Sequence, residues 1–104
     1  MKFIINGMKY DTDKMQMLSD KTKVFVEHEG LELMLARQIN GDNGNYGRYV
    51  DSKIFVSDKG NYLEVFEKGC YTYGKAISEE EAKRKLAKYD LEVCEKLFGE
   101  FEEA

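Results

Sequence analysis

The chain has 104 residues, enough for one domain with a single modest hydrophobic core. Hydrophobic residues make up 42% and charged residues 35%, which is the composition of a globular chain and excludes a disordered one. A net charge of −4 makes the chain a poor binder of phosphate backbones and anionic membrane surfaces. We therefore expect one α+β domain over residues 1–104, with a protein rather than nucleic acid or membrane as its partner.

No apolar run approaches the eighteen or so residues of a membrane span, and the first apolar stretch is too short for a signal peptide. We therefore expect a cytoplasmic protein. Cys70 and Cys94 form no Cys-x-x-Cys pair, so two free thiols are expected. Cys70, beside a glycine in a loop, should be the more exposed of the two.

Asn6 and Gly7 separate two apolar runs, which is the strongest short signal for a β-hairpin. The pairing of Ile5 with Met8 and of Phe3 with Tyr10 would place all four side chains on one buried side. The acidic residues that follow offer N-cap candidates, and we expect a short helix over residues 13–19.

Residues 21–38 are ambiguous. Val24, Val26 and His28 alternate with Phe25, Glu27 and Glu29, and this two-residue period indicates a strand. Residues 31–38 also alternate, although each of them is a good helix former. We expect a second strand there, because a hairpin that turns at Gly30 explains both segments. A long turn-forming loop should follow over residues 40–47.

The centre of the expected sheet is a hairpin over residues 53–67, whose two runs are rich in β-branched and aromatic residues. Gly60 can adopt the positive φ that a short turn requires. Both runs place apolar groups on both faces, which is typical of strands inside a sheet. A second loop is expected over residues 69–75.

The C-terminal part is predicted to be two helices. Ser78 and Glu81 form a capping box, and Glu81 with Lys85 is one of three successive i,i+4 ion pairs. Asp90 should begin the second helix and Gly99 should end it. That helix carries an apolar stripe of Leu91, Cys94, Leu97, Phe98 and Phe101.

Residue types that carry catalysis or bind metals are sparse. His28 is the only histidine, and a surface or half-buried strand histidine is the favoured interpretation. Glu79, Glu80 and Glu81 diverge by about 100° each around a helix, so they cannot converge on one ion. Asp42 and Asn43 lack the order of a calcium loop. We expect no catalytic residue, no cofactor and no metal.

Aromatic and basic residues interleave in the middle of the chain, and on one sheet face they could stack single-stranded bases. The acidic balance favours the plainer interpretation, a hydrophobic sheet with solvated lysines. The residues of this alternative nucleic-acid face are Tyr46, Arg48, Tyr49, Lys53, Lys59 and Tyr62.

Four stretches, over residues 1–13, 57–63, 76–82 and 95–100, together resemble small uncharacterised accessory proteins carried by conjugative elements, plasmids and phages of Firmicutes. The resemblance covers about half of the chain and includes no catalytic motif. It implies a genomic setting, a mobile genetic element. Small acidic proteins of such elements include anti-CRISPR proteins, which inhibit by binding an effector nuclease.

These observations predict a non-catalytic protein that binds a host or element protein, with an anti-CRISPR inhibitor of an effector nuclease as the sharpest version. A nucleic-acid-binding accessory or regulatory factor is the alternative. Acidic side chains on or after the last helix could face a basic partner. These expected partner-binding residues are Glu92, Glu95, Glu100, Glu102 and Glu103.

Overall fold

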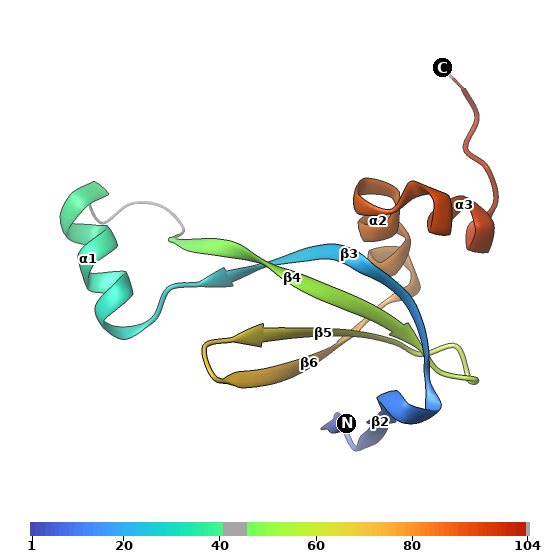
Figure 1. The fold of residues 1–104 in the computed structure, drawn as a ribbon, viewed down its shortest axis with the longest axis horizontal. Helices are drawn as coiled ribbons and strands as arrows, with labels where there is room; N and C mark the ends of the chain where they lie inside the picture. The colour runs from blue at the N-terminus through green and yellow to red at the C-terminus, as the bar shows by residue number, and fades with distance from the viewer. Residues whose placement is uncertain (41–45, 104) are drawn as a thin grey trace.

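The computed structural model describes residues 1–40 and 46–103 (Figure 1). Its elements in chain order are β1 (Lys2–Ile5), β2 (Met8–Asp11), a short 3-10 helix η1 (Thr12–Lys14), β3 (Gln16–Glu27), α1 (Gly30–Asn40), β4 (Gly47–Val56), β5 (Tyr62–Lys68), β6 (Tyr71–Ile77), α2 (Glu79–Tyr89) and α3 (Leu91–Phe98). β1 and β2 form a small antiparallel sheet. The other four strands form a larger antiparallel sheet in the order β3-β4-β5-β6. The expected α+β class is confirmed.

The predicted central hairpin is confirmed, because β4 and β5 are the inner strands of the larger sheet. Gly60 has a φ of +81° in the turn between them. Ile54 on β4 and Leu63 on β5 are both fully buried, although they belong to opposite faces of the sheet. A strand buried on both faces needs apolar residues at successive positions, which explains the sequence pattern.

Different elements cover the two faces of the larger sheet. On one, the helical face, Ile54 and Ile77 pack against Ala82 of α2. On the other, the hairpin face, Leu63 and Val65 pack against Tyr10 of β2, with Phe3 and Ile5 of β1 beside them. The core is therefore two thin apolar layers, one on each side of the sheet.

The N-terminal hairpin has the predicted register, with Phe3 opposite Tyr10 and Ile5 opposite Met8. Asn6 and Gly7 have the positive φ values, 52° and 76°, that its two-residue turn requires. Tyr10 is buried and Phe3 is half-buried, while Met8 remains exposed. The hairpin can approach the sheet because Gly74 of β6 lies under Phe3, where a Cβ atom would meet the ring at 2.6 Å.

The helix predicted over residues 13–19 is wrong. Asp11 does cap a helical turn, since its side chain accepts a hydrogen bond from the Asp13 N–H at 3.1 Å. That turn ends at Lys14, and β3 begins at Gln16. Met17 pairs with Phe55 and Ser19 pairs with Ile54 on β4. Pairing with the central strand therefore overrides the local cap signal.

The strand predicted over residues 31–38 is also wrong, because this segment lies in α1. β3 takes β4 as its antiparallel partner, with Glu27 opposite Gly47. Residues 31–38 do not pair with β3, although β3 is an edge strand of the sheet, and they adopt the helix that their own propensities favour. Gly30 has the positive φ of a turn residue, 58°, but the turn leads into a helix.

The loop predicted over residues 69–75 is wrong in most of its length, because Tyr71–Ile77 is β6, which pairs with β5. Only the turn at Gly69, with a φ of +64°, fits the prediction. Tyr71 and Tyr73 are β-forming residues, and they pair with Lys68 and Phe66 of β5. The loop predicted over residues 40–47 falls largely outside the described residues.

The two C-terminal helices are confirmed. Ser78 caps α2 by accepting a hydrogen bond from the Glu81 N–H at 3.1 Å. Asp90 precedes α3, and Gly99, with a φ of +94°, ends it. The apolar stripe of α3 is only partly covered. Cys94 is buried as predicted, while Leu91, Leu97 and Phe101 are each about half exposed.

Candidate functional site

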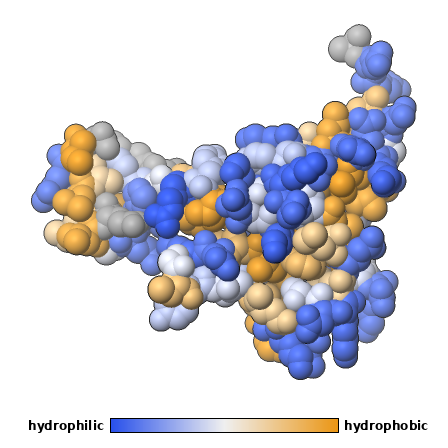
Figure 2. All heavy atoms as spheres, in the orientation of Figure 1, coloured by the Kyte–Doolittle hydropathy of each residue, from blue (hydrophilic) through white to orange (hydrophobic). Residues whose placement is uncertain are grey.

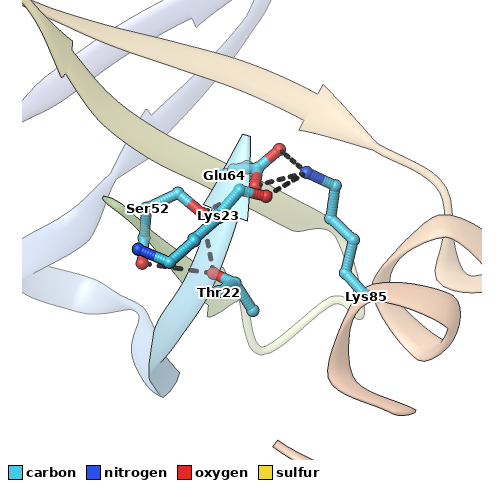
Figure 3. Close-up of polar contacts among 5 residues, drawn as sticks. All are labelled: Thr22, Lys23, Ser52, Glu64 and Lys85. Carbon is cyan, nitrogen blue, oxygen red and sulfur yellow. Dashed lines mark hydrogen bonds and ion pairs between the residues drawn. The ribbon is translucent and has the colours of Figure 1, made fainter. Parts of the chain in front are cut away.

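Two features of the structure stand out as candidate sites. One is a buried polar network under α2, and the other is an exposed apolar face on α1. The network links four side chains from four elements: Thr22 of β3, Ser52 of β4, Glu64 of β5 and Lys85 of α2 (Figure 3). All lie on the helical face of the sheet.

Hydrogen bonding in this network has a defined direction. The Lys85 ammonium donates to both carboxylate oxygens of Glu64, at 2.9 and 2.7 Å, and to the backbone carbonyl of Lys23 at 3.1 Å. The Ser52 hydroxyl donates to Glu64 Oε2 at 2.8 Å. The Thr22 hydroxyl donates to the Ser52 backbone carbonyl at 3.1 Å, and its oxygen also lies within hydrogen-bond distance of Ser52 Oγ, at 2.7 Å.

A serine beside a carboxylate and a lysine superficially resembles a nucleophile with its base. Burial argues against that interpretation. Glu64 is 0% exposed and Ser52 is 2% exposed, so a substrate has no path to either oxygen. The network satisfies the polar atoms that the sheet buries, and it fixes α2 on the sheet.

A second buried polar contact joins the start of the sheet to the last helix. Ser19 donates a hydrogen bond of 2.6 Å to Asp90 Oδ2, and both residues are buried. Ser19 lies between two register shifts in β3, and its hydroxyl also accepts from the Lys21 N–H at 3.1 Å. The Asp90 carboxylate therefore anchors an irregular stretch of β3 and makes no cap bond to α3.

α1 lies at the opposite end of the molecule from α2 and α3, beyond the ends of β3 and β4 (Figure 1). Leu31, Leu35 and Ile39 follow one another at four-residue spacing, and Met34 lies beside them. These four residues form what we call the α1 outer face, and they are between 50% and 80% exposed. Figure 2 shows the resulting hydrophobic surface on this helix.

An amphipathic helix normally turns its apolar side toward the core. In α1 the opposite side, with Leu33 and Ala36, is the half-buried one, and the larger apolar group faces solvent. Isolated exposed leucines are common on protein surfaces, but a contiguous group on one helix face is typical of an interaction site. This face is the accessible candidate site.

The alternative nucleic-acid residues do not share one face. Arg48 and Tyr49 are neighbours on β4 and point to opposite sides of the sheet. Tyr62 packs against the Ile54 cluster on the helical face, and burial raises the pKa of its hydroxyl. Lys53 lies on the hairpin face with Tyr49, Lys59 is in the β4–β5 turn, and Tyr46 precedes β4.

The structure gathers the five predicted partner-binding glutamates at the α3 end. Glu92 and Glu95 are on α3, the former exposed and the latter half-buried. Glu100, Glu102 and Glu103 follow the helix and are exposed. They are far along the chain from the α1 outer face and belong to a separate surface.

The remaining candidates are the residue types that carry catalysis or bind metals. Within residues 1–40 and 46–103, no three His, Cys, Asp or Glu side chains are grouped closely enough to hold a metal ion. Of the helices in this same part of the chain, none is both long and apolar enough to cross a membrane. His28 is half-buried just after β3, and its backbone N–H donates to the Tyr46 carbonyl at 2.8 Å.

Comparisons with known proteins found no relative: no family model, no curated protein and no solved structure matches the chain. Function must therefore be argued from the structure itself. The α1 outer face was missed at the level of sequence because residues 31–38 were assigned to a strand. The four-residue spacing of Leu31, Leu35 and Ile39 was the signal for it.

Proposed function

We propose that this protein is a non-catalytic binding protein that places the α1 outer face in an apolar groove of another protein. The observation that carries the proposal is the exposure of Leu31, Met34, Leu35 and Ile39 on one side of a helix that stands at the end of the sheet. Helix-in-groove recognition uses apolar anchors that recur every three or four residues along one side of a helix, and these four residues have that spacing.

The energetic reason is the burial of apolar surface. Full burial of one aliphatic side chain is favourable by about 1.5–3 kcal/mol relative to leaving it exposed. Leu31 and Ile39, at 69% and 80% exposed, have most of that gain still available. A partner that covers the face would recover it, and the short helix offers its anchors without an internal rearrangement of the sheet.

The setting implied by the resemblance fits this activity. A small protein of a mobile genetic element, acting in the cytoplasm, would bind a host or element protein, and inhibition of a CRISPR effector nuclease is its sharpest version. Nothing in this mode of action requires a catalytic residue or a cofactor. The structural role of the Ser52–Glu64–Lys85 network supports a binding function over an enzymatic one.

The test compares Leu35→Glu on α1 with Leu91→Glu on α3. The two leucines are 50% and 49% exposed, so the same substitution is made in equivalent solvent environments. Each tagged variant and the unaltered protein would be used to capture partners from a nuclease-treated host lysate. Each would also be assayed for inhibition of a purified CRISPR effector nuclease.

We expect the Leu35→Glu variant to capture no partner and to inhibit no nuclease. The Leu91→Glu variant should still capture the partner that binds α1. Equal capture by both variants would contradict the proposal. Tight, salt-sensitive DNA binding in a parallel filter assay, with no protein partner, would instead favour the accessory-factor function. Circular dichroism would establish that both variants are folded.

A further inference from the structure

We infer that α3 and the segment after it form a second docking surface, which takes a basic protein surface with an apolar centre. This C-terminal surface consists of Leu91, Leu97 and Phe101 with five glutamates around them: Glu92, Glu95, Glu100, Glu102 and Glu103. The inference goes beyond the proposed function, because it uses different elements and specifies the chemistry of the partner.

Charge is distributed very unevenly along the chain. Residues 1–90 carry 15 basic and 15 acidic side chains, whereas residues 91–104 carry one lysine and five glutamates. The net charge of −4 therefore comes entirely from the C-terminal part. The field that a partner would experience is concentrated at this end of the molecule.

The same region has an apolar component that a solvated acidic tail would lack. Leu91, Leu97 and Phe101 are each between 46% and 49% exposed, and they flank the buried Cys94. The domain therefore covers the middle of the α3 stripe and leaves its margins open. Figure 2 shows hydrophobic side chains beside hydrophilic ones at this end of the molecule.

Lys83 of α2 holds these groups together. Its Nζ lies 5.9 Å from the centre of the Phe98 ring and 5.5 Å from the centre of the Phe101 ring. A cation between two aromatic faces is attracted to both of them. Phe101, which lies beyond the end of α3, is thereby kept beside the helix, and the acidic residues around it are presented with the apolar ones.

The negative charge of the C-terminal surface indicates which class of partner fits it. A second copy would bring its own five glutamates against these five, which is unfavourable. Nucleic acid and anionic lipid surfaces are repelled for the same reason. A protein surface with lysine or arginine around an apolar centre matches both components, and the opposite charges would accelerate association.

The probe is a short amphipathic peptide with one leucine face and one lysine face, whose binding to the full chain is followed by fluorescence anisotropy. Two control peptides replace lysine by glutamate or leucine by serine. We expect the Leu/Lys peptide to bind, with an affinity that falls as salt is added. The Leu/Glu peptide should not bind, and the Ser/Lys peptide should bind at least about fivefold more weakly because apolar burial is lost.

Matched charge reversals locate the binding site. Glu100→Lys, Glu102→Lys and Glu103→Lys together should weaken peptide binding at least about tenfold. The control combines Glu27→Lys, Glu67→Lys and Glu80→Lys, which are exposed and change the net charge equally. Phe101→Ser, outside every helix and strand, should weaken binding about threefold or more without affecting the fold.

Three outcomes would overturn the inference. Equal weakening by the two charge-reversed proteins would mean that only net charge matters. Equal affinity for the Leu/Lys and Ser/Lys peptides would mean that the apolar residues take no part. Loss of peptide binding in Leu35→Glu would place the peptide on α1, and that result would leave the proposed function standing while removing this second surface.

Discussion

Lys85 directs all three of its ammonium protons to acceptors on the sheet: both carboxylate oxygens of Glu64 and the backbone carbonyl of Lys23. Glu64 is fully buried on the inner strand β5, and Lys23 is on the edge strand β3. One side chain of α2 therefore contacts two strands that are not neighbours. This relationship specifies where α2 lies on the sheet more sharply than its few apolar contacts do.

The first prediction concerns this ion pair. Lys85→Met leaves the Glu64 carboxylate buried without its cation, and should lower the free energy of unfolding by about 3–5 kcal/mol. Glu64→Gln should cost less, about 1–3 kcal/mol, because the Lys85 side chain is 22% exposed and can be solvated by water. Urea denaturation, monitored by circular dichroism, measures both values.

The double variant Glu64→Leu with Lys85→Met provides the matching control. It removes both charges and places apolar groups under α2, so its loss of stability should be smaller than the sum of the losses for Glu64→Leu and Lys85→Met measured singly. Additive losses would show that the two side chains are not energetically coupled.

The second prediction concerns the N-terminal hairpin. A Cβ atom on Gly74 would lie 2.6 Å from Cγ of Phe3, the ring atom that is bonded to the Phe3 Cβ and so cannot easily move away. Gly74→Ala should therefore displace the hairpin and cost about 1–3 kcal/mol. Gly74→Ala combined with Phe3→Ala should cost less than the sum of the two single substitutions in a melting experiment, and a fully additive result would contradict the contact.

The third prediction isolates a purely conformational effect. Nothing lies within 4 Å of the position that a Cβ on Gly60 would occupy, but its φ is +81°. Gly60→Val should destabilise the protein by about 1–3 kcal/mol, because a β-branched residue resists positive φ. Gly60→Asn should cost clearly less, since asparagine tolerates this region. Thermal melting of the two variants side by side checks the ranking.

The fourth prediction uses the two thiols. Burial raises the pKa of the Cys94 thiol above its ordinary value of 9.0; Lys83 acts in the opposite direction and Glu95 in the same one. Cys70 is exposed, and should react with a thiol reagent much faster than Cys94 in the native protein. Both should react in denaturant. Equal native rates would contradict the burial of Cys94.

The shifted pKa of Cys94 also predicts how stability depends on pH. Above pH 9 the unfolded chain loses the Cys94 proton while the folded chain retains it, so the unfolded state is favoured as pH rises. Stability should fall from pH 9 upward, and Cys94→Ala should reduce that slope. The raised pKa values of Tyr62 and Lys23 add a decline of the same sign at higher pH, which Cys94→Ala leaves unchanged.

Much of the fold could be predicted because its signals are local. The turn at Asn6 and Gly7, the positive φ of Gly60 and the Ser78 cap each depend on residues within a few positions of one another. Residues 31–38 were misassigned because their two-residue alternation suggested a strand, whereas each of these residues is a good helix former and the segment lies in α1.

The rest depends on contacts that the linear order conceals. Lys85 was expected to pair with Glu81 on the surface of its own helix, but it reaches Glu64 across 21 positions of the chain. Gly74 lies in a segment that was predicted to be a loop, although it is the position in β6 that makes room for Phe3. Both results follow from how α2 and the N-terminal hairpin lie on the sheet, which no local pattern encodes.

The hydrogen bond between Ser19 and Asp90 has a consequence for synthesis of the protein. Its two partners are 71 positions apart in the chain, so this bond can form only after nearly the whole domain has been synthesised. A nascent chain that ends before residue 90 lacks the Asp90 carboxylate, so its Ser19 hydroxyl bonds to water instead. The Ser19–Asp90 bond is therefore among the last contacts that synthesis of the domain makes possible.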